Sequence, residues 1–140
     1  MNLLRDLEEL LKLAQQMQHM ASMAPGLAER GELKALEELT LQRKRMASRS
    51  RALMNRLAPA FERWEESLEG LGEAQAQRCW ALAGQVEEAF KQALKADAQL
   101  REILGRQLKD TQAELNRLKH TGQALRAYQE AAGRGGVRQG

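Results

Sequence analysis

The chain begins with apolar residues at helical spacing. The positions of this first stripe are Leu3, Leu7, Leu10, Ala14, Met17 and Ala21. Because the steps between them are four and three residues, they share one face of an amphipathic helix. Asn2 has a side chain that can cap the start of this helix. Pro25 and Gly26 predict its end within about two to four residues, because proline cannot continue the hydrogen-bond ladder, and Gly31 marks a second break.

A second apolar stripe follows. Its residues are Leu36, Leu39, Met46, Leu53 and Leu57. Arg43 and Ser50 fall on the same line, so the predicted seam is only partly apolar. We expect this helix to stop before Pro59, since proline suits the first turn of a following helix. A short third piece would then end at the glycines of residues 70–72.

The longest predicted helix lies in the C-terminal half, because no proline occurs from Glu73 to Ala132 and apolar residues recur throughout. Unbroken, it would extend roughly 90 Å at about 1.5 Å per residue. The shorter helices cannot cover that length, so we expect a break or bend near Gly84 or Gly105. Residues 133–140 are rich in glycine and predict a disordered tail.

These stripes predict an all-α protein: an antiparallel helical bundle or hairpin of three to four helices with a long C-terminal helix. We expect a single domain over residues 1–132. The composition agrees with this interpretation, because leucine, alanine, glutamate, lysine and arginine are typical of long helices.

The charge pattern argues against a general affinity for nucleic acid. The formal net charge of +3 comes from 22 basic and 19 acidic residues that are largely interleaved. Charged residues also interrupt the first 23 positions, so we expect neither a signal peptide nor a membrane span. A single cysteine, Cys79, cannot form an internal disulfide. We therefore predict a cytoplasmic protein.

The sequence predicts no enzyme. His19 and His120 are the only histidines and Cys79 is the only thiol, and we interpret Cys79 as a small buried apolar group. There is no zinc-ligand spacing, phosphate-binding glycine loop or serine elbow. We expect no catalytic residue, no metal site and no cofactor.

Three groups of side chains are candidates for contact with a partner. An apolar stripe on the long helix is the main one, with Tyr128 one turn beyond it; its residues are Leu104, Leu108, Leu115, Leu118 and Leu125. The stripe is either core or a seam for a partner helix. The basic run from Arg43 to Arg56 is interpreted as a solvated or ion-paired face, with an anionic protein partner as the alternative. Trp64 and Trp80 are interpreted as core residues.

Two stretches resemble the flagellar type III export chaperones of the FliT/FlgN kind. The first, LAERGELKALEELTLQRKRM, covers Leu27 to Met46, and the second, DAQLREILGRQLKDTQAELNRLKHTGQALRAY, covers Asp97 to Tyr128. The positions that carry the resemblance are Gly31, Glu32, Asp97, Leu125, Ala127 and Tyr128.

The resemblance implies a cytoplasmic chaperone that binds the helical end of a filament-cap or hook-junction protein and prevents its premature assembly. It also implies delivery of this cargo to the cytoplasmic domain of the export gate, with Tyr128 helping the loaded complex to dock. Two alternatives stay open: a coiled-coil stalk or linker subunit of the export ATPase complex, and a helical protein that binds nucleic acid. A homodimer is also left open.

Overall fold

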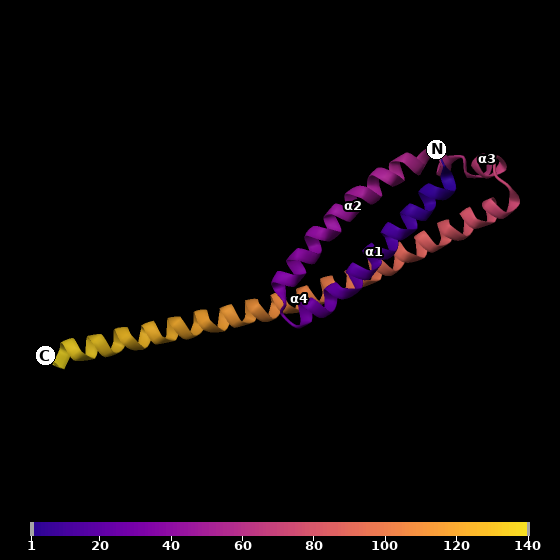
Figure 1. Cartoon of the computed structure of the whole chain (residues 1–140). Helices are drawn as coiled ribbons and strands as arrows, with labels where there is room; N and C mark the ends of the chain where they lie inside the picture. Colours follow the sequence, from indigo (N-terminus) through magenta and orange to yellow (C-terminus); the bar gives the residue numbers. More distant parts are fainter. Residues whose placement is uncertain (1, 140) are drawn as a thin grey trace. The chain divides into compact units, whose positions relative to one another are not determined.

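The computed structural model describes the backbone of residues 2–139 and the side chains of residues 2–133. That part of the chain contains four α-helices: α1 (Leu3–Glu29), α2 (Leu33–Glu62), α3 (Trp64–Glu69) and α4 (Glu73–Gln139) (Figure 1). The prediction of an all-α bundle with a long C-terminal helix is confirmed. None of the described helices has the length and hydropathy of a membrane span.

The chain divides into two compact units, Met1–Ile103 and Leu104–Gly140, which are called the N-terminal and C-terminal units below. The N-terminal unit contains α1, α2, α3 and the first part of α4. The C-terminal unit is the remainder of α4. Whether residues 1–132 fold as one domain stays a prediction, and so does the disordered tail at 133–140, where the side chains beyond Gly133 lie outside the described residues.

Residues next to α1 in the sequence determine where this helix begins and ends. The Asn2 side chain accepts a hydrogen bond of 3.1 Å from the backbone N–H of Arg5, as expected of a helix cap. At the other end Gly31 has a φ of 70°, and the next N–H, of Glu32, donates to the carbonyl of Leu27 at 3.0 Å. This is the Schellman arrangement that glycine permits at low cost.

Both prolines lie inside helices instead of at their boundaries. α1 continues past Pro25 to Glu29, and α2 continues past Pro59 to Glu62, so the expectation that α2 stops before Pro59 is wrong. Each proline removes one hydrogen bond, but the residues beyond it bury apolar surface, which offsets that loss. Leu27 is buried beyond the first proline and Ala60 beyond the second. The ends still fall within four residues of each proline.

The break expected near Gly84 or Gly105 does not occur, because α4 is a single helix from Glu73 onward, and a bend at these glycines stays a prediction. A glycine inside a helix weakens it by about 1 kcal/mol relative to alanine, yet it keeps its backbone hydrogen bonds. The glycine break at residues 70–72 is confirmed, since α3 ends at Glu69 and α4 begins at Glu73.

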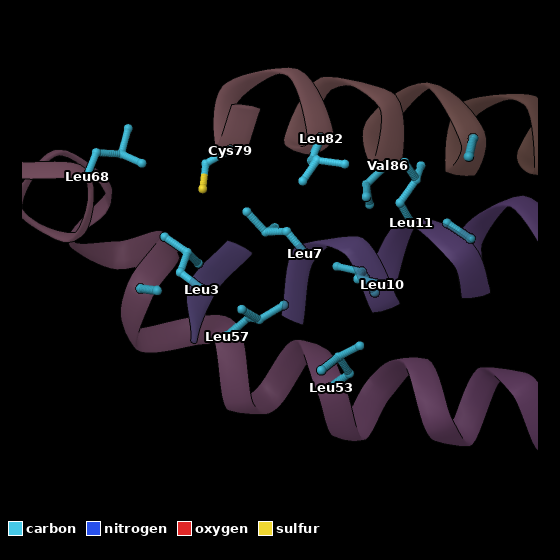
Figure 2. Close-up of a cluster of buried hydrophobic side chains, with 13 residues drawn as sticks. Leu3, Leu7, Leu10, Leu11, Leu53, Leu57, Leu68, Cys79, Leu82 and Val86 are labelled. Atoms are coloured by element: carbon cyan, nitrogen blue, oxygen red, sulfur yellow. The ribbon is translucent and has the colours of Figure 1, made fainter. Parts of the chain in front are cut away.

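The core of the N-terminal unit is largest at one end, where four helices contribute to a single apolar cluster (Figure 2). Leu7 of α1, Leu57 of α2 and Leu82 of α4 are fully buried there. Farther along, Leu27 of α1 packs with Leu39 of α2. α1 and α2 are therefore antiparallel, as predicted.

The middle of the N-terminal unit is packed with smaller and more polar side chains. Its apolar cluster consists of Ala21, Ala93 and Ala96, to which α2 adds no apolar residue. Arg43 of α2 instead reaches Asp97 of α4, with distances of 2.8 and 3.0 Å from one guanidinium nitrogen to the two carboxylate oxygens. The polar positions noticed in the second stripe thus belong to the interior seam.

Candidate partner-binding site

The six residues predicted to bind a partner all lie on α4 in the C-terminal unit, and all are exposed. Exposure ranges from 39% of the side chain at Leu104 to 73% at Tyr128. The core residues of the N-terminal unit are less than 10% exposed. The stripe is therefore not part of the core of the described chain, and the alternative that treated it as core is not supported. The five leucines among these residues are called the leucine seam.

The spacing of the leucine seam places its leucines on one face of α4. Steps of four residues from Leu104 to Leu108 and of three from Leu115 to Leu118 are the steps between neighbours on a helix surface. Thr111 and Gly122 fall on the same line and leave two gaps in the apolar face. The two smaller residues leave space between the leucines, and side chains of another helix can pack into that space.

Charged side chains border the leucine seam. Glu114 precedes Leu115 and forms an ion pair of 2.6 Å with Arg117, one turn later. Lys119 follows Leu118 on the other border of the seam. Because these groups are exposed, they contribute little to stability, but they favour a partner with complementary charges over one with matching charges.

Tyr128 lies one turn beyond Leu125 and is more exposed than any leucine of the seam. Its ring offers apolar surface and its hydroxyl offers a donor and an acceptor, which is why tyrosine is common in protein interfaces. The structure places it close to the end of the leucine face.

Cys79 and His19, two of the residues considered for catalysis, lie in different surroundings. Cys79 is completely buried in the main core cluster. Burial raises the pKa of its thiol, and the charge of Glu8 adds to the rise. His19 is exposed on α1, and among the described residues no group of three or more His, Cys, Asp or Glu side chains could hold a metal ion. Cys79 thus has the buried environment and raised pKa of a structural thiol.

The interpretation of both tryptophans as core residues is only half right. Trp64 packs against the main core cluster, whereas Trp80 is 59% exposed. The difference follows from helical geometry, because Trp80 succeeds Cys79 on α4 and successive residues face different directions. The rings of Trp64 and Trp80 meet edge to face at 5.4 Å, and the buried Nε1–H of Trp64 has no acceptor among the described residues.

The basic run on α2 is ion-paired at two positions. Arg43 pairs with Asp97, and Arg56 lies 3.8 Å from Asp6 of α1. Arg45 and Arg49 instead line an open hollow between α1 and α2, together with Lys12. The sequence did not indicate this grouping, because Lys12 lies far from the run along the chain.

Comparisons of the chain with models of protein families, with curated proteins and with solved structures find no match.

Proposed function

We propose that this protein is a chaperone that binds an apolar helical segment of another protein along the leucine seam of α4. The observation that carries the proposal is the exposure of Leu108, Leu115, Leu118 and Leu125, each between 55% and 59%. Fully burying a leucine side chain stabilises a complex by about 1.5–3 kcal/mol. A partner that covers several of them gains enough free energy to offset much of the cost of association.

The chemistry of the seam favours a helix as the occupant. The leucines recur with the mixed three- and four-residue steps of a coiled coil, and Thr111 and Gly122 leave room between them. An extended peptide would leave its own backbone N–H and C=O groups unpaired against such a surface, whereas a helix satisfies them internally. The expected partner is an amphipathic helix that would otherwise associate with itself.

The identity of the cargo rests on the resemblance of residues 27–46 and 97–128 to the FliT/FlgN chaperones. On that basis the cargo is the helical end of a flagellar cap or hook-junction protein, and the complex is delivered to the export gate of the type III secretion apparatus. The stalk-subunit alternative calls for two long helices without a third element. The packing of α1, α2 and α4 around one core favours the chaperone instead.

The test is the affinity of the full chain for the purified helical end of each candidate cargo. Leu108→Glu and Leu115→Glu each place a carboxylate in the seam and are expected to weaken binding at least about tenfold, which corresponds to about 1.4 kcal/mol. Ala113→Glu is the matched control, because Ala113 is exposed on the opposite face of α4. It should bind as the wild type does.

The helicity and melting temperature of each free variant must be measured alongside its affinity. Because both leucines are exposed, neither substitution should unfold the chain. Loss of folding in Leu108→Glu or Leu115→Glu, or equal affinity in all three variants, would remove the seam from the binding site. Sedimentation of the wild type also decides whether the same seam forms a homodimer in the absence of cargo.

A further inference from the structure

A groove runs between α1 and α2 in the middle of the N-terminal unit. It consists of two adjoining hollows of about 570 and 580 Å³ that share Lys12, Gln16 and Arg49. The groove exists because α2 buries no apolar residue between Leu39 and Leu53. The two helices are therefore held together at their ends and are less closely packed between them.

The groove carries unpaired positive charge. Lys12, Arg45 and Arg49 line it, and among the described residues none of the three forms an ion pair. Their neighbours on α2 differ in this respect, because Arg43 and Arg56 have carboxylate partners. The only acidic side chain that lines either hollow is Glu9, at one end. The groove is thus complementary to an anionic occupant.

The same groove also has an apolar component. Met20 and Met46 face it from α1 and α2 and are partly buried, and Leu13 lines the adjoining hollow. Methionine is flexible and polarizable, so a surface of this kind adapts to apolar side chains of different shapes. Amide groups of Gln15, Gln16 and Gln42 supply further hydrogen bonds.

We propose that this groove binds an acidic amphipathic helix of a partner protein. Its apolar side chains contact Met20 and Met46, and its carboxylates pair with Lys12, Arg45 and Arg49. The lining residues on α1 run from Glu9 to Met20, which is about 17 Å of helix and therefore matches roughly three turns of a docked helix. This surface lies in the N-terminal unit and does not depend on the leucine seam.

The lining favours a protein helix over a nucleic acid. Phosphates would satisfy the three cations, but a nucleic-acid backbone has no apolar side chains to cover the two methionines. Phenylalanine, tyrosine and tryptophan, on whose rings single-stranded bases commonly stack, are absent from the lining, and His19 supplies its single aromatic ring. An acidic amphipathic helix satisfies both parts of the surface.

The experiment measures binding of labelled synthetic peptides to the full chain by fluorescence anisotropy. The probe is an amphipathic helical peptide of about four turns, with leucine on one face and glutamate on the other, and its control has glutamine in place of every glutamate. The acidic peptide should bind at least about tenfold more tightly than the glutamine peptide, and its affinity should fall as salt is added. Equal affinities for the two peptides would overturn the proposal.

The double variant Arg45→Gln with Arg49→Gln should reduce the affinity for the acidic peptide at least about tenfold. Lys44→Gln with Arg51→Gln removes the same charge from another face of α2 and should have little effect. Met46→Gln should weaken binding several-fold, because it removes apolar contact and leaves the charges unchanged. Equal losses in the two double variants would show that only net charge matters, and the groove would then not be the site.

Three further measurements keep the result interpretable. If the double variant fails to fold, the amide chemical shifts of the wild type must change at residues 12–20 and 42–49 on peptide addition, and changes confined elsewhere contradict the proposal. A duplex DNA that binds more tightly than the acidic peptide and loses affinity in the Arg45→Gln, Arg49→Gln variant would assign the groove to nucleic acid instead. Leu108→Glu should retain peptide binding, which separates this site from the seam.

Discussion

Arg43 and Asp97 are charged residues in the partly polar interior seam of the N-terminal unit, and each stabilises the other. Their side chains are 22% and 30% exposed, so they are only partly screened by water. Asp97→Asn removes the charge while keeping the shape, and it should lower the free energy of unfolding by about 1–2 kcal/mol. Urea denaturation measures the change.

The exposed pair between Glu114 and Arg117 supplies the control for this prediction. Its side chains are more than half exposed, so Glu114→Gln should change the unfolding free energy by less than about 0.5 kcal/mol. If Asp97→Asn were as mild as Glu114→Gln, the interior pair would contribute nothing that a surface pair does not.

Cys79 is predicted to be an unreactive thiol that changes how the free energy of unfolding depends on pH. Because burial raises its pKa in the folded chain, the unfolded chain loses the thiol proton first as the pH rises. The stabilisation that depends on the protonated thiol is complete below the ordinary thiol pKa of about 8.5 and decreases above it. Relative to Cys79→Ala, the wild type should therefore lose stability as the pH rises above the ordinary thiol pKa.

The same thiol should not react with a disulfide reagent until the chain unfolds, since the thiolate is the reactive form and the sulfur is completely buried. Labelling in the absence and presence of urea tests this directly. Rapid labelling of the folded chain would show that the core cluster around Cys79 opens easily.

Pro25 is an internal defect of α1 whose removal should stabilise the helix. Its ring lacks the N–H that would otherwise donate to the carbonyl of Ala21. Pro25→Ala restores this donor and should raise the unfolding free energy by about 1–3 kcal/mol. Thermal unfolding of this variant, compared with Gln15→Ala on the same helix, measures the effect. An unchanged or lower stability would mean that the ring makes contacts that compensate for the missing bond.

The boundaries that the sequence predicted well are those with a local cause. Asn2 caps α1 through its own side chain, and Gly31 ends the helix through its positive φ. The position of Pro25 inside the helix could not be predicted in the same way. Whether a helix passes a proline depends on what the following residues bury, and burial of Leu27 against Leu39 involves another helix.

The leucine seam was visible in the sequence because all of its members lie on one helix with regular spacing. Its exposure was not, because the spacing of apolar residues along one helix does not show whether another helix covers them. The groove between α1 and α2 could not be predicted for a related reason. Lys12 and Arg49 are far apart in the sequence and line the same hollow only because α1 and α2 pack antiparallel. Trp80 was misassigned because its stripe neighbours did not reveal which side of α4 faces the core.

At the scale of the whole molecule, the chain combines an N-terminal unit that buries an apolar core with a C-terminal unit whose leucines are 39–59% exposed. A chain that needed these leucines for its own folding would bury them. Their exposure is costly in water, and binding of a partner helix removes that cost. The proposed chaperone function accounts for this arrangement.

The predicted role of Tyr128 involves a third protein, the export gate, in addition to this chain and its cargo. The resemblance to the export chaperones implies that it helps the loaded complex to dock on the export gate. Tyr128→Ala should leave folding and cargo affinity nearly unchanged while weakening the gate contact by about 1–4 kcal/mol, the range of an interface anchor. Calorimetry of the wild-type and variant cargo complexes against the cytoplasmic domain of the gate measures the difference, and Tyr128→Phe separates the ring from the hydroxyl.

Equal affinities of the two complexes for the gate would remove Tyr128 from the docking site. A large fall in the melting temperature of the free variant would instead assign the tyrosine a structural role. Its 73% exposure predicts that the melting temperature stays within a few degrees of the wild type.

In the proposed mechanism the leucine seam is exposed in the free chain and covered in the cargo complex. Hydrogen–deuterium exchange of the full chain, with and without the helical end of the cargo, measures this change. We expect fast exchange of residues 104–125 in the free chain and strong protection of the same residues when cargo binds, with little change in the core around Leu7 and Leu82. Slow exchange of residues 104–125 in the free chain, or cargo protection confined to the N-terminal unit, would show that the seam is not the binding site.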